Sequence, residues 1–509
     1  MVKKYPLRGN PTLYEINTAA WLFELSQKLG NPVTLGNVPP EEWDKLKELG
    51  MDLIWLLGVW ERSQEGRKLN LASKEFRASF EIVLPGCTPE DIIGSCYSIS
   101  SYGPDPQIGT WEDLDSAREQ IRKRGMGLIL DFLPNHTGMD HHWVAEHPEY
   151  YIQGDENDYE KDKGAFFVVT HGGRKLYLAH GRDPNFPPWT DTAQLNYFNP
   201  EVRQAMVQRL EIIARHCDGV RCDMAMLVLN DIFRKDWGWF NRNPAYAMPT
   251  QEFWTQAVKE VPTPIYIAEA YWDTEWTLQQ MGFDFVYDKR LYDRIRDSRP
   301  HDVYLHLTAG IDYQRKLVRF IENHDELRSV TAFGKAKAMA AAVLFSTLPG
   351  LKLYFQGQLE GKKIRLPLQI RRTRLEPVDR EISAFYHKLL PLVSEEIFRT
   401  GAFQLKTVFP ESDKTSENVI ACTWRLGGSC CLVIVNLSES ASSGRIPLQD
   451  GISEDRTYLF SEGLNGQNFV QSGKLIAHPG LSFHLKGYEA HLWKIEETFP
   501  GRKVSASAS

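Results

Sequence analysis

The chain has 509 residues, of which 42% are hydrophobic and 25% are charged, and its formal net charge is −7. This length exceeds one ordinary core and provides for two or three domains, with the composition of a globular protein. The negative charge argues against nucleic acid or an anionic membrane as the main partner and leaves neutral substrates open.

Strand-like and helix-like segments alternate over most of the chain. We expect strands at 12–16, 52–57, 127–133, 219–223, 264–268, 283–287, 317–321 and 351–355. Helical patterns separate them, as at 41–49, 110–124, 201–216, 250–260 and 335–346. Most strand runs are uniformly apolar, which is typical of parallel strands buried on both faces. The alternation predicts an α/β fold, a parallel (β/α)8 TIM barrel.

The third expected strand is followed by an unusually long connection. It spans roughly 60 residues, with no helix expected before residue 200, and connections of this length are usually functional or small domains. Its acidic run at 155–162 lacks the spacing of a calcium loop and indicates a solvated face. We predict an inserted domain at 137–198 that covers one side of the site, between barrel parts 1–136 and 199–394.

The last part of the chain changes character. Short runs of β-branched and aromatic residues at 419–424, 430–435, 457–459 and 491–495 are separated by Gly, Ser and Asn turns. This pattern predicts a C-terminal antiparallel β-sandwich over 395–497. The polar residues 498–509 are expected to form a disordered tail.

The seven cysteines are scattered, odd in number and without the paired spacing of a zinc site. Cys217 and Cys222 lie beside and within an expected strand, which indicates buried thiols. No apolar run reaches the ~20 residues of a membrane span, and the start of the chain lacks the apolar segment of a secretory signal. We therefore expect a reduced, cytoplasmic protein with no membrane partner.

Acidic residues accompany the ends of four expected strands: Asp131, Asp223, Glu269 and Asp325. The carboxyl ends of parallel barrel strands meet at one face, so these carboxylates can converge. Cleavage of a glycosidic bond needs such convergence, with one carboxylate as nucleophile and another as proton donor. Arg221 lies two residues before Asp223 and therefore points to the same side of the strand. It either favours the ionised nucleophile or forms a buried structural ion pair.

The other polar residues at these strand ends have less specific signals. Glu269 directly follows a buried strand and is suited to protonate the leaving glycosidic oxygen, although barrel strands often end in a polar residue. Asp325, next to His324, is suited to bind sugar hydroxyls and to help distort the ring. His136 is either a second hydroxyl ligand or a satisfied structural residue.

Taken together, these segments resemble the signature regions of the α-amylase family, glycoside hydrolase family thirteen. The matching motifs are Asp131-x-x-x-Asn135-His136, Gly219-x-Arg221-x-Asp223, Glu269 and Asn323-His324-Asp325. The resemblance implies Asp223 as nucleophile, Glu269 as acid/base and Asp325 as transition-state stabiliser. It also implies four substrate-binding residues, of which one is a tyrosine that stacks on the sugar: Tyr97, His136, Arg221 and His324.

Two positions depart from the family pattern. Endo-acting α-amylases usually carry Lys-His three and four residues after the nucleophile, whereas Met226 and Leu227 stand here. An apolar pair cannot donate those hydrogen bonds, which argues against starch-type endo-hydrolysis. Gln194 occupies the place of an Asp that binds calcium in some members, and it is a poorer calcium ligand. Asn135 is then either a calcium ligand or a hydrogen-bond partner of its own loop.

The resemblance implies retaining cleavage of α-glucans or short α-glucosides through a covalent glycosyl–Asp223 intermediate, with no organic cofactor. A glucanotransferase or glucosyltransferase with the same residues is the alternative, in which another sugar replaces water. A catalytically silent glycan-binding homologue is a remote alternative, because all three acids are present. Among the aromatic residues, Trp60 and Trp272 are expected to lie closest to the cleft. The donor sugar, the linkage and the oligomeric state stay open.

Overall fold

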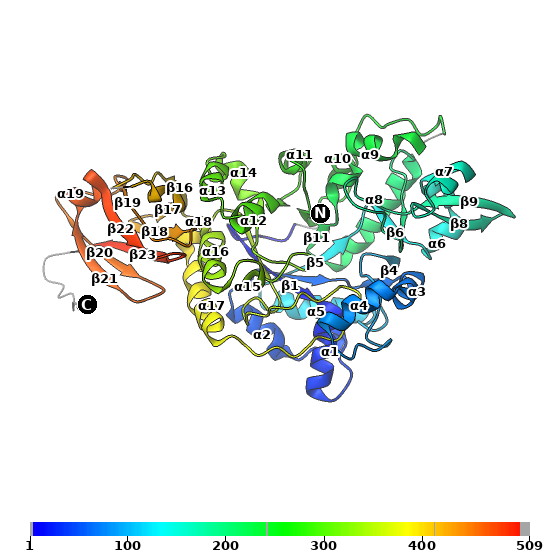
Figure 1. Cartoon of the computed structure of the whole chain (residues 1–509), viewed down its shortest axis with the longest axis horizontal. Coiled ribbons are helices and arrows are strands. Elements are labelled where there is room, and N and C mark those ends of the chain that lie inside the picture. The colour runs from blue at the N-terminus through cyan, green and yellow to red at the C-terminus, as the bar shows by residue number, and fades with distance from the viewer. Residues whose placement is uncertain (1–3, 241–242, 412, 499–509) are drawn as a thin grey trace.

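The computed structural model describes residues 4–240, 243–411 and 413–498, so the expected disordered tail lies outside these ranges from residue 499 onward. Eight parallel strands close into a barrel in the order β1-β15-β14-β13-β12-β11-β5-β2 (Figure 1). They are β1 (Thr12–Asn17), β2 (Leu53–Leu57), β5 (Gly127–Phe132), β11 (Gly219–Cys222), β12 (Ile265–Ala268), β13 (Phe285–Tyr287), β14 (Leu317–Arg319) and β15 (Leu351–Phe355). All eight expected strands are present, and the predicted barrel is confirmed.

The barrel strands are buried on both faces. In β2, Leu53, Trp55 and Leu57 belong to a cluster inside the barrel. The alternate residues Ile54 and Leu56 belong to the larger core that includes the surrounding helices. This two-sided burial is the physical reason that the strand runs are uniformly apolar.

Helices surround the barrel and begin at local sequence signals. The main ones are α1 (Thr18–Leu29), α2 (Pro40–Glu48), α5 (Trp111–Lys123), α8 (Pro200–His216), α10 (Phe253–Glu260), α12 (Lys289–Arg296), α13 (Pro300–Leu307), α14 (Ile311–Arg315), α16 (Lys335–Thr347) and α17 (Arg380–Val393). Thr110 and Asp113 form a capping box at the start of α5. Asn199 caps α8, which begins with proline.

Two helices that the sequence analysis did not name follow β3 (Trp60–Arg62), which pairs with β4 (Ile99–Pro104). They are α3 (Gln64–Ala72) and α4 (Lys74–Val83). Ser73 ends the first and caps the second, since its side chain accepts a hydrogen bond from the Phe76 N–H. This helix pair lies on the blue side of the barrel in Figure 1, close to β4.

The long connection after β5 folds into small strands and two short helices. These are β6 (His136–Gly138), α6 (His142–Glu146), β7 (Gln153–Gly154), α7 (Glu156–Lys161), β8 (Phe166–His171), β9 (Arg174–Ala179) and β10 (Thr192–Gln194). The expectation that no helix precedes residue 200 is therefore wrong. Helix α7 has a capping box but no buried residue, so it carries no apolar periodicity. Its residues are solvated, as expected.

The C-terminal strands form an antiparallel domain at the opposite end of the molecule from the β8–β9 hairpin (Figure 1). Six strands have the order β16 (Ala402–Lys406), β17 (Val419–Leu426), β18 (Ser429–Asn436), β23 (Ala490–Glu497), β20 (Thr457–Glu462) and β21 (Asn468–Ser472). A second sheet pairs β19 (Ser442–Ile446) with β22 (Leu481–Leu485). Ile446 and Leu481 share a core with Leu432 of the larger sheet, which makes a sandwich. The sequence analysis did not name β16, β19, β21 or β22, of which β19 and β21 are largely polar.

All seven cysteines are unpaired, and Cys217 and Cys222 are buried as expected. Burial raises the pKa of the Cys217 thiol to about 12, so this group is protonated and unreactive at neutral pH. None of the helices in the described ranges is both long and apolar enough to cross a membrane.

Candidate active site

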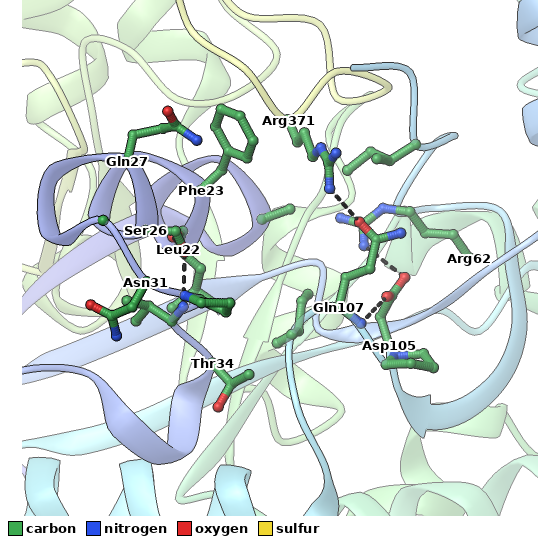
Figure 2. Close-up of a pocket in the computed structure, with 17 residues that line it drawn as sticks. Leu22, Phe23, Ser26, Gln27, Asn31, Thr34, Arg62, Asp105, Gln107 and Arg371 are labelled. Atoms are coloured by element: carbon green, nitrogen blue, oxygen red, sulfur yellow. Dashed lines mark hydrogen bonds and ion pairs between the residues drawn. The ribbon is translucent and has the colours of Figure 1, made fainter. Parts of the chain in front are cut away.

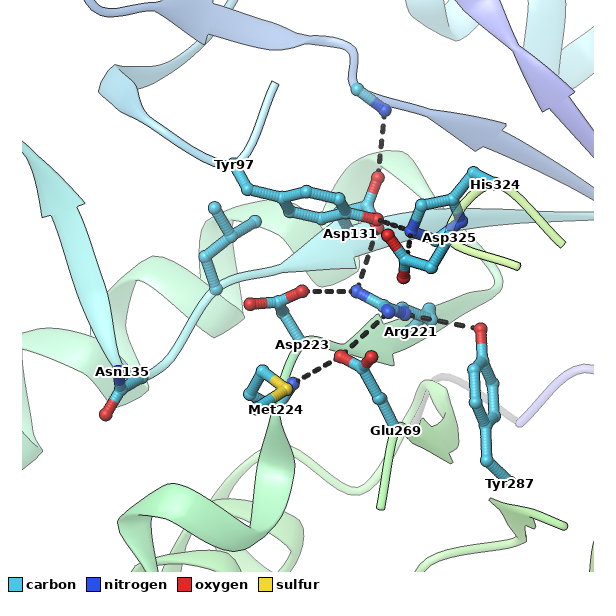
Figure 3. A network of polar contacts seen from close by, with 12 residues as sticks. Tyr97, Asp131, Asn135, Arg221, Asp223, Met224, Glu269, Tyr287, His324 and Asp325 are labelled. Carbon is cyan, nitrogen blue, oxygen red and sulfur yellow. Dashed lines mark hydrogen bonds and ion pairs between the residues drawn. The ribbon is translucent and has the colours of Figure 1, made fainter. Parts of the chain in front are cut away.

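Asp223 and Glu269 lie side by side at the carboxyl ends of neighbouring strands. The register of β11 and β12 pairs Cys222 with Ala268, so the residue after each strand stands at the same height in the barrel. Arg221 spans the two carboxylates (Figure 3): its Nη1 is 2.6 Å from Asp223 Oδ1, and its Nη2 is 2.8 Å from Glu269 Oε2. All three side chains are buried.

Two further donors contact Glu269. The Met224 backbone N–H donates to Glu269 Oε2 at 2.7 Å, and the Tyr271 hydroxyl donates to Oε1 at 2.7 Å. Met224 has the left-handed conformation φ 42°, ψ 48°, which is uncommon for a non-glycine residue. The turn after Asp223 thus presents a backbone N–H to the neighbouring carboxylate.

His324 connects Asp325 to the interior of the barrel. Its Nε2 is 2.9 Å from Asp325 Oδ2 and 3.0 Å from the Tyr97 hydroxyl, and its Nδ1 contacts Glu15 Oε1. Glu15 lies in β1 and is fully buried, whereas the Asp325 side chain is 47% exposed and reaches the cleft. Sequence analysis did not single out Glu15. The available signal was a lone carboxylate inside an apolar strand.

This cluster holds more carboxylates than cations: Glu15, Asp131, Asp223, Glu269 and Asp325 surround Arg221 and His324. Burial raises the pKa of Glu269 to about 7, against the attraction of Arg221. Burial also raises the pKa of Asp223, so Arg221 alone does not set its ionisation as the sequence suggested. Although burial acts the other way, His324 lowers the pKa of Asp325 to about 2. Glu269 is therefore suited to hold a proton near neutral pH.

Tyr97 and His136, the remaining predicted substrate-binding residues, line a hollow next to Asp223, whereas Arg221 and His324 are buried beneath it. The Tyr97 ring centroid is 5.3 Å from the Arg221 guanidinium carbon. His136 Nε2 is 2.9 Å from the Tyr97 carbonyl oxygen, and its ring lies 5.1 Å from that of Trp189. Burial lowers the pKa of His136 to about 4, so its ring is neutral. The hydrogen bond to the Tyr97 carbonyl occupies its Nε2 nitrogen.

Asn135 lies apart from the carboxylates (Figure 3) and forms an amide pair with Gln194 of β10. Gln194 Nε2 is 2.9 Å from Asn135 Oδ1, and Asn135 Nδ2 is 3.2 Å from Gln194 Oε1. The described residues contain no group of three or more His, Cys, Asp or Glu side chains placed to hold a metal ion. The Asn135 amide oxygen thus accepts the Gln194 amide, as the hydrogen-bonding alternative expected, and whether Asn135 also binds calcium stays a prediction.

Two hollows meet at Glu269 and Asp325. The first, here called the Asp223 hollow, has a volume of about 370 Å³ and is also lined by Tyr97, His136 and Asp223. The second, the Trp272 hollow, measures about 620 Å³ and is lined by aromatic residues that include Tyr271 and Trp272. Trp189 and Met224 border both. The two hollows form one cleft with the acid pair at its centre.

Of the two tryptophans expected closest to the cleft, only Trp272 lies there. Trp272 is 40% exposed in the Trp272 hollow, whereas Trp60 is fully buried. Trp60 Nε1 donates to the Asp131 carbonyl at 2.7 Å, because β3 turns back to pair with β4. Met226 and Leu227 are buried in the 3-10 turn after Asp223, so they cannot contact a sugar.

A third hollow, of about 650 Å³, lies between α1 and residues 105–108 (Figure 2). Arg62 Nη1 is 3.2 Å from Asp105 Oδ2 there, and Arg371 donates to the Gln107 side chain at 3.0 Å. The lining residues include no member of the carboxylate cluster. This hollow is therefore not where the acid pair lies, and the cleft is the candidate active site.

Comparison with curated proteins finds relatives named as amylases and glucosidases. The α-amylase 3 of Dictyoglomus thermophilum is 25% identical over 288 residues, which are 52% of this chain and 53% of that protein. The α-glucosidase of Apis mellifera is 24% identical over 363 residues, or 63% and 58% of the two chains. The chain thus spans little more than half the length of these relatives.

Solved structures share the fold across almost the whole chain. A noncanonic maltogenic α-amylase from Thermotoga neapolitana superposes with a TM-score of 0.68 at 21% identity, covering 95% of this chain and 98% of the other. A trehalose-6-phosphate hydrolase from Bacillus licheniformis gives 0.61 at 17% identity, covering 96% and 100%. At these identities the likeness concerns the fold alone.

The family model of the α-amylase catalytic domain matches residues 40–365, which is well over half of the chain. The matched region contains seven of the eight barrel strands and all four acids of the motifs. This match agrees with the closed barrel and with the carboxylates at its strand ends. The chain belongs to the α-amylase family, glycoside hydrolase family thirteen, whose members are glycoside hydrolases or related transglycosylases.

Proposed function

We propose that this protein cleaves α-glucosidic bonds in α-glucans or short α-glucosides with retention of configuration. The observation that carries the proposal is the pair Asp223 and Glu269, bridged by Arg221 at 2.6 Å and 2.8 Å. One guanidinium group sets the separation of the two carboxylates. This favours the ~5 Å spacing of retaining glycosidases over the ~6.5–9.5 Å of inverting ones.

The reaction proceeds by double displacement. Asp223 attacks the anomeric carbon, and a covalent glycosyl ester forms as the glycosidic bond breaks. Glu269 gives its proton to the leaving oxygen, for which a pKa of about 7 keeps the proton available at neutral pH. Glu269 then takes a proton from water, which attacks the ester and releases Asp223. Asp325, held by His324, binds sugar hydroxyls and stabilises positive charge on the ring.

The two hollows have different tasks in this mechanism. Asp223 lines only the first, so the Asp223 hollow holds the donor sugar. Glu269 borders both hollows, as an acid must that protonates the bond between two sugars. The Trp272 hollow therefore holds the leaving group.

Transfer to a second sugar is the other candidate function, and one observation favours it. The Trp272 hollow is walled by Phe186, Tyr271 and Trp272, whose rings suit the faces of an acceptor sugar. A well-held acceptor would compete with water for the same glycosyl–Asp223 ester.

Product analysis tests both candidates. Maltose, maltotetraose, sucrose and trehalose are incubated with the wild type and with Asp223→Asn as control. Products shorter than the substrate alone support hydrolysis, and longer products support transfer. A 2-deoxy-2-fluoro-α-glucosyl fluoride should label Asp223, which peptide mass spectrometry detects. Cleavage with label on another residue would overturn the mechanism, and no cleavage of any donor together with no label would overturn the function.

A further inference from the structure

Two polar side chains in the Asp223 hollow have no role in the mechanism above. Asn70 comes from α3 and Asp191 from the segment just before β10, and both line the hollow together with Tyr97 and Asp223. Leu69 of α3 and Phe76 of α4 border the same hollow. The helix pair that follows β3 therefore contributes one wall of the donor side.

A glycine brings this wall close to Asp191. A Cβ atom on Gly66 would lie 3.2 Å from the Asp191 Cβ and 3.2 Å from the hydroxyl oxygens of Ser63 and Ser98. Glycine thus permits α3 to pack directly against residue 191. Asn70 lies four residues after Gly66, on the same face of the helix. Asn70 and Asp191 consequently face the hollow from adjacent positions.

The Asn70 side chain is only 2% exposed, yet its oxygen makes no hydrogen bond with any residue that the structure describes. Buried polar groups are nearly always paired, so an unpaired amide oxygen on a residue that lines a cavity calls for a partner outside the chain. The half-buried Asp191 carboxylate has no ion pair among the described residues. An amide that donates and accepts, beside a carboxylate that accepts, matches the hydroxyl groups of a sugar.

We propose that Asn70 and Asp191 bind hydroxyl groups of the donor sugar and so determine which glycosyl unit is transferred to Asp223. This assignment rests on the proposed glycosidase function. The specificity of the donor side then comes from α3, a helix outside the four signature motifs. A site built to hydrogen-bond a hydroxyl rejects an analogue without it, because its own polar groups stay unpaired.

The test combines enzyme variants with altered substrates. Initial rates are measured on 4-nitrophenyl α-glucoside and on its 2-, 3-, 4- and 6-deoxy analogues, for wild type, Asn70→Leu and Asp191→Asn. Each variant should lose about 10- to 100-fold in kcat/KM on the parent glucoside. It should lose less than about 3-fold on the analogue that lacks its partner hydroxyl, because that interaction is already absent. Lys68→Ala, an exposed change on the same helix, is the matched control and should stay within about 2-fold.

A second readout does not need turnover of the aryl glucoside. Calorimetry measures binding of maltotriose to Glu269→Gln, with and without Asn70→Leu, and we expect at least about 10-fold weaker binding with Asn70→Leu. The unfolding temperature of Asn70→Leu should be unchanged or higher, because leucine removes an unpaired buried amide at similar volume.

The outcomes separate this inference from the proposed function. If the wild type cleaves its donors and neither variant changes rate or binding, the inference is overturned and the function stands. Equal losses on every deoxy analogue, or a lower unfolding temperature, would indicate a structural role and also overturn the inference. If the wild type cleaves no donor and Glu269→Gln binds no glucoside, the proposed function fails and the inference fails with it.

Discussion

Two arginines are buried in the barrel wall, and they differ in the number of carboxylates around them. Arg319 is matched by one carboxylate, whereas Arg221 lies near three. Arg319 of β14 contacts one carboxylate, Asp288, the residue directly after β13. Its other N–H groups bond to the Gln314 side chain and to a backbone carbonyl, and Asp288 also lies 2.9 Å from His306. Although burial opposes ionisation, His306 and Arg319 hold the pKa of Asp288 at about 2. The pair is satisfied and fully charged.

Arg221 of β11 contacts too many carboxylates for its single charge. Asp223 accepts a hydrogen bond from it, Glu269 lies within ion-pair distance at 2.8 Å, and Asp131 lies 3.9 Å away. Burial raises the pKa of Asp131 to about 6 and that of Glu269 to about 7. A balanced buried pair holds structure together, whereas a surplus of carboxylates keeps protons that chemistry can move.

Asp223→Asn should show the largest effect on activity with no loss of stability. It removes the nucleophile and is expected to reduce the rate on the order of 10⁴-fold or more. Because it also removes one surplus buried carboxylate, the unfolding temperature should stay the same or rise. Initial rates and thermal unfolding of the purified variant check both statements. A large loss of stability would mean that the Arg221 cluster is structural as well.

Asp288→Asn should show the reverse pattern: a large loss of stability and a much smaller loss of activity. Removing one partner of a buried pair leaves the Arg319 charge uncompensated, which typically costs about 3–5 kcal/mol. Urea unfolding should reveal this loss, while the rate per folded molecule changes far less than in Asp223→Asn. An inactive Asp288→Asn of wild-type stability would contradict the distinction between the two clusters.

Glu15→Gln tests the part of the active cluster that lies deepest in the barrel. Burial lowers the pKa of His324, but Asp325 and Glu15 raise it well above its usual value. Without the Glu15 charge, His324 loses its proton at lower pH and holds Asp325 less firmly. We expect a rate loss of roughly 10-fold that grows as the pH rises, because a charged hydrogen bond contributes about 1.5–3 kcal/mol. A loss that is the same from pH 5 to 9 would show a purely structural role.

Tyr271→Phe should have the smallest effect. The tyrosine hydroxyl donates to Glu269 and therefore favours the ionised carboxylate. Activity that needs protonated Glu269 falls as the pH rises through about 7. The variant should move this basic limb upward by about one pH unit, since a hydrogen bond to an ionised carboxylate contributes about 1.5 kcal/mol or more and one pH unit corresponds to about 1.4 kcal/mol. The pH dependence of kcat/KM measures it, and a downward shift would show that the hydroxyl acts otherwise.

Strand ends alone did not separate the two clusters in the sequence. Asp288 follows a barrel strand just as Glu269 does, yet it belongs to a structural pair. The difference lies in His306 and Arg319, which come from a later helix and strand. The motifs identified the acids of the site correctly as neighbours, but Asn70 and Trp60 show where local patterns fail. The residues that flank Asn70 do not predict that its oxygen is unpaired, and those that flank Trp60 do not predict that it is buried.

The sequence by itself determined the barrel and the face at which its acids meet, because short, uniformly apolar runs that alternate with helical patterns are typical of parallel strands buried on both sides. Tertiary structure decided which acid keeps a proton and which stays charged. A pKa depends on burial and on charges that arrive from anywhere in the chain. Glu15 and His324 are 309 residues apart in sequence and in contact in the folded protein, and no local pattern records that contact.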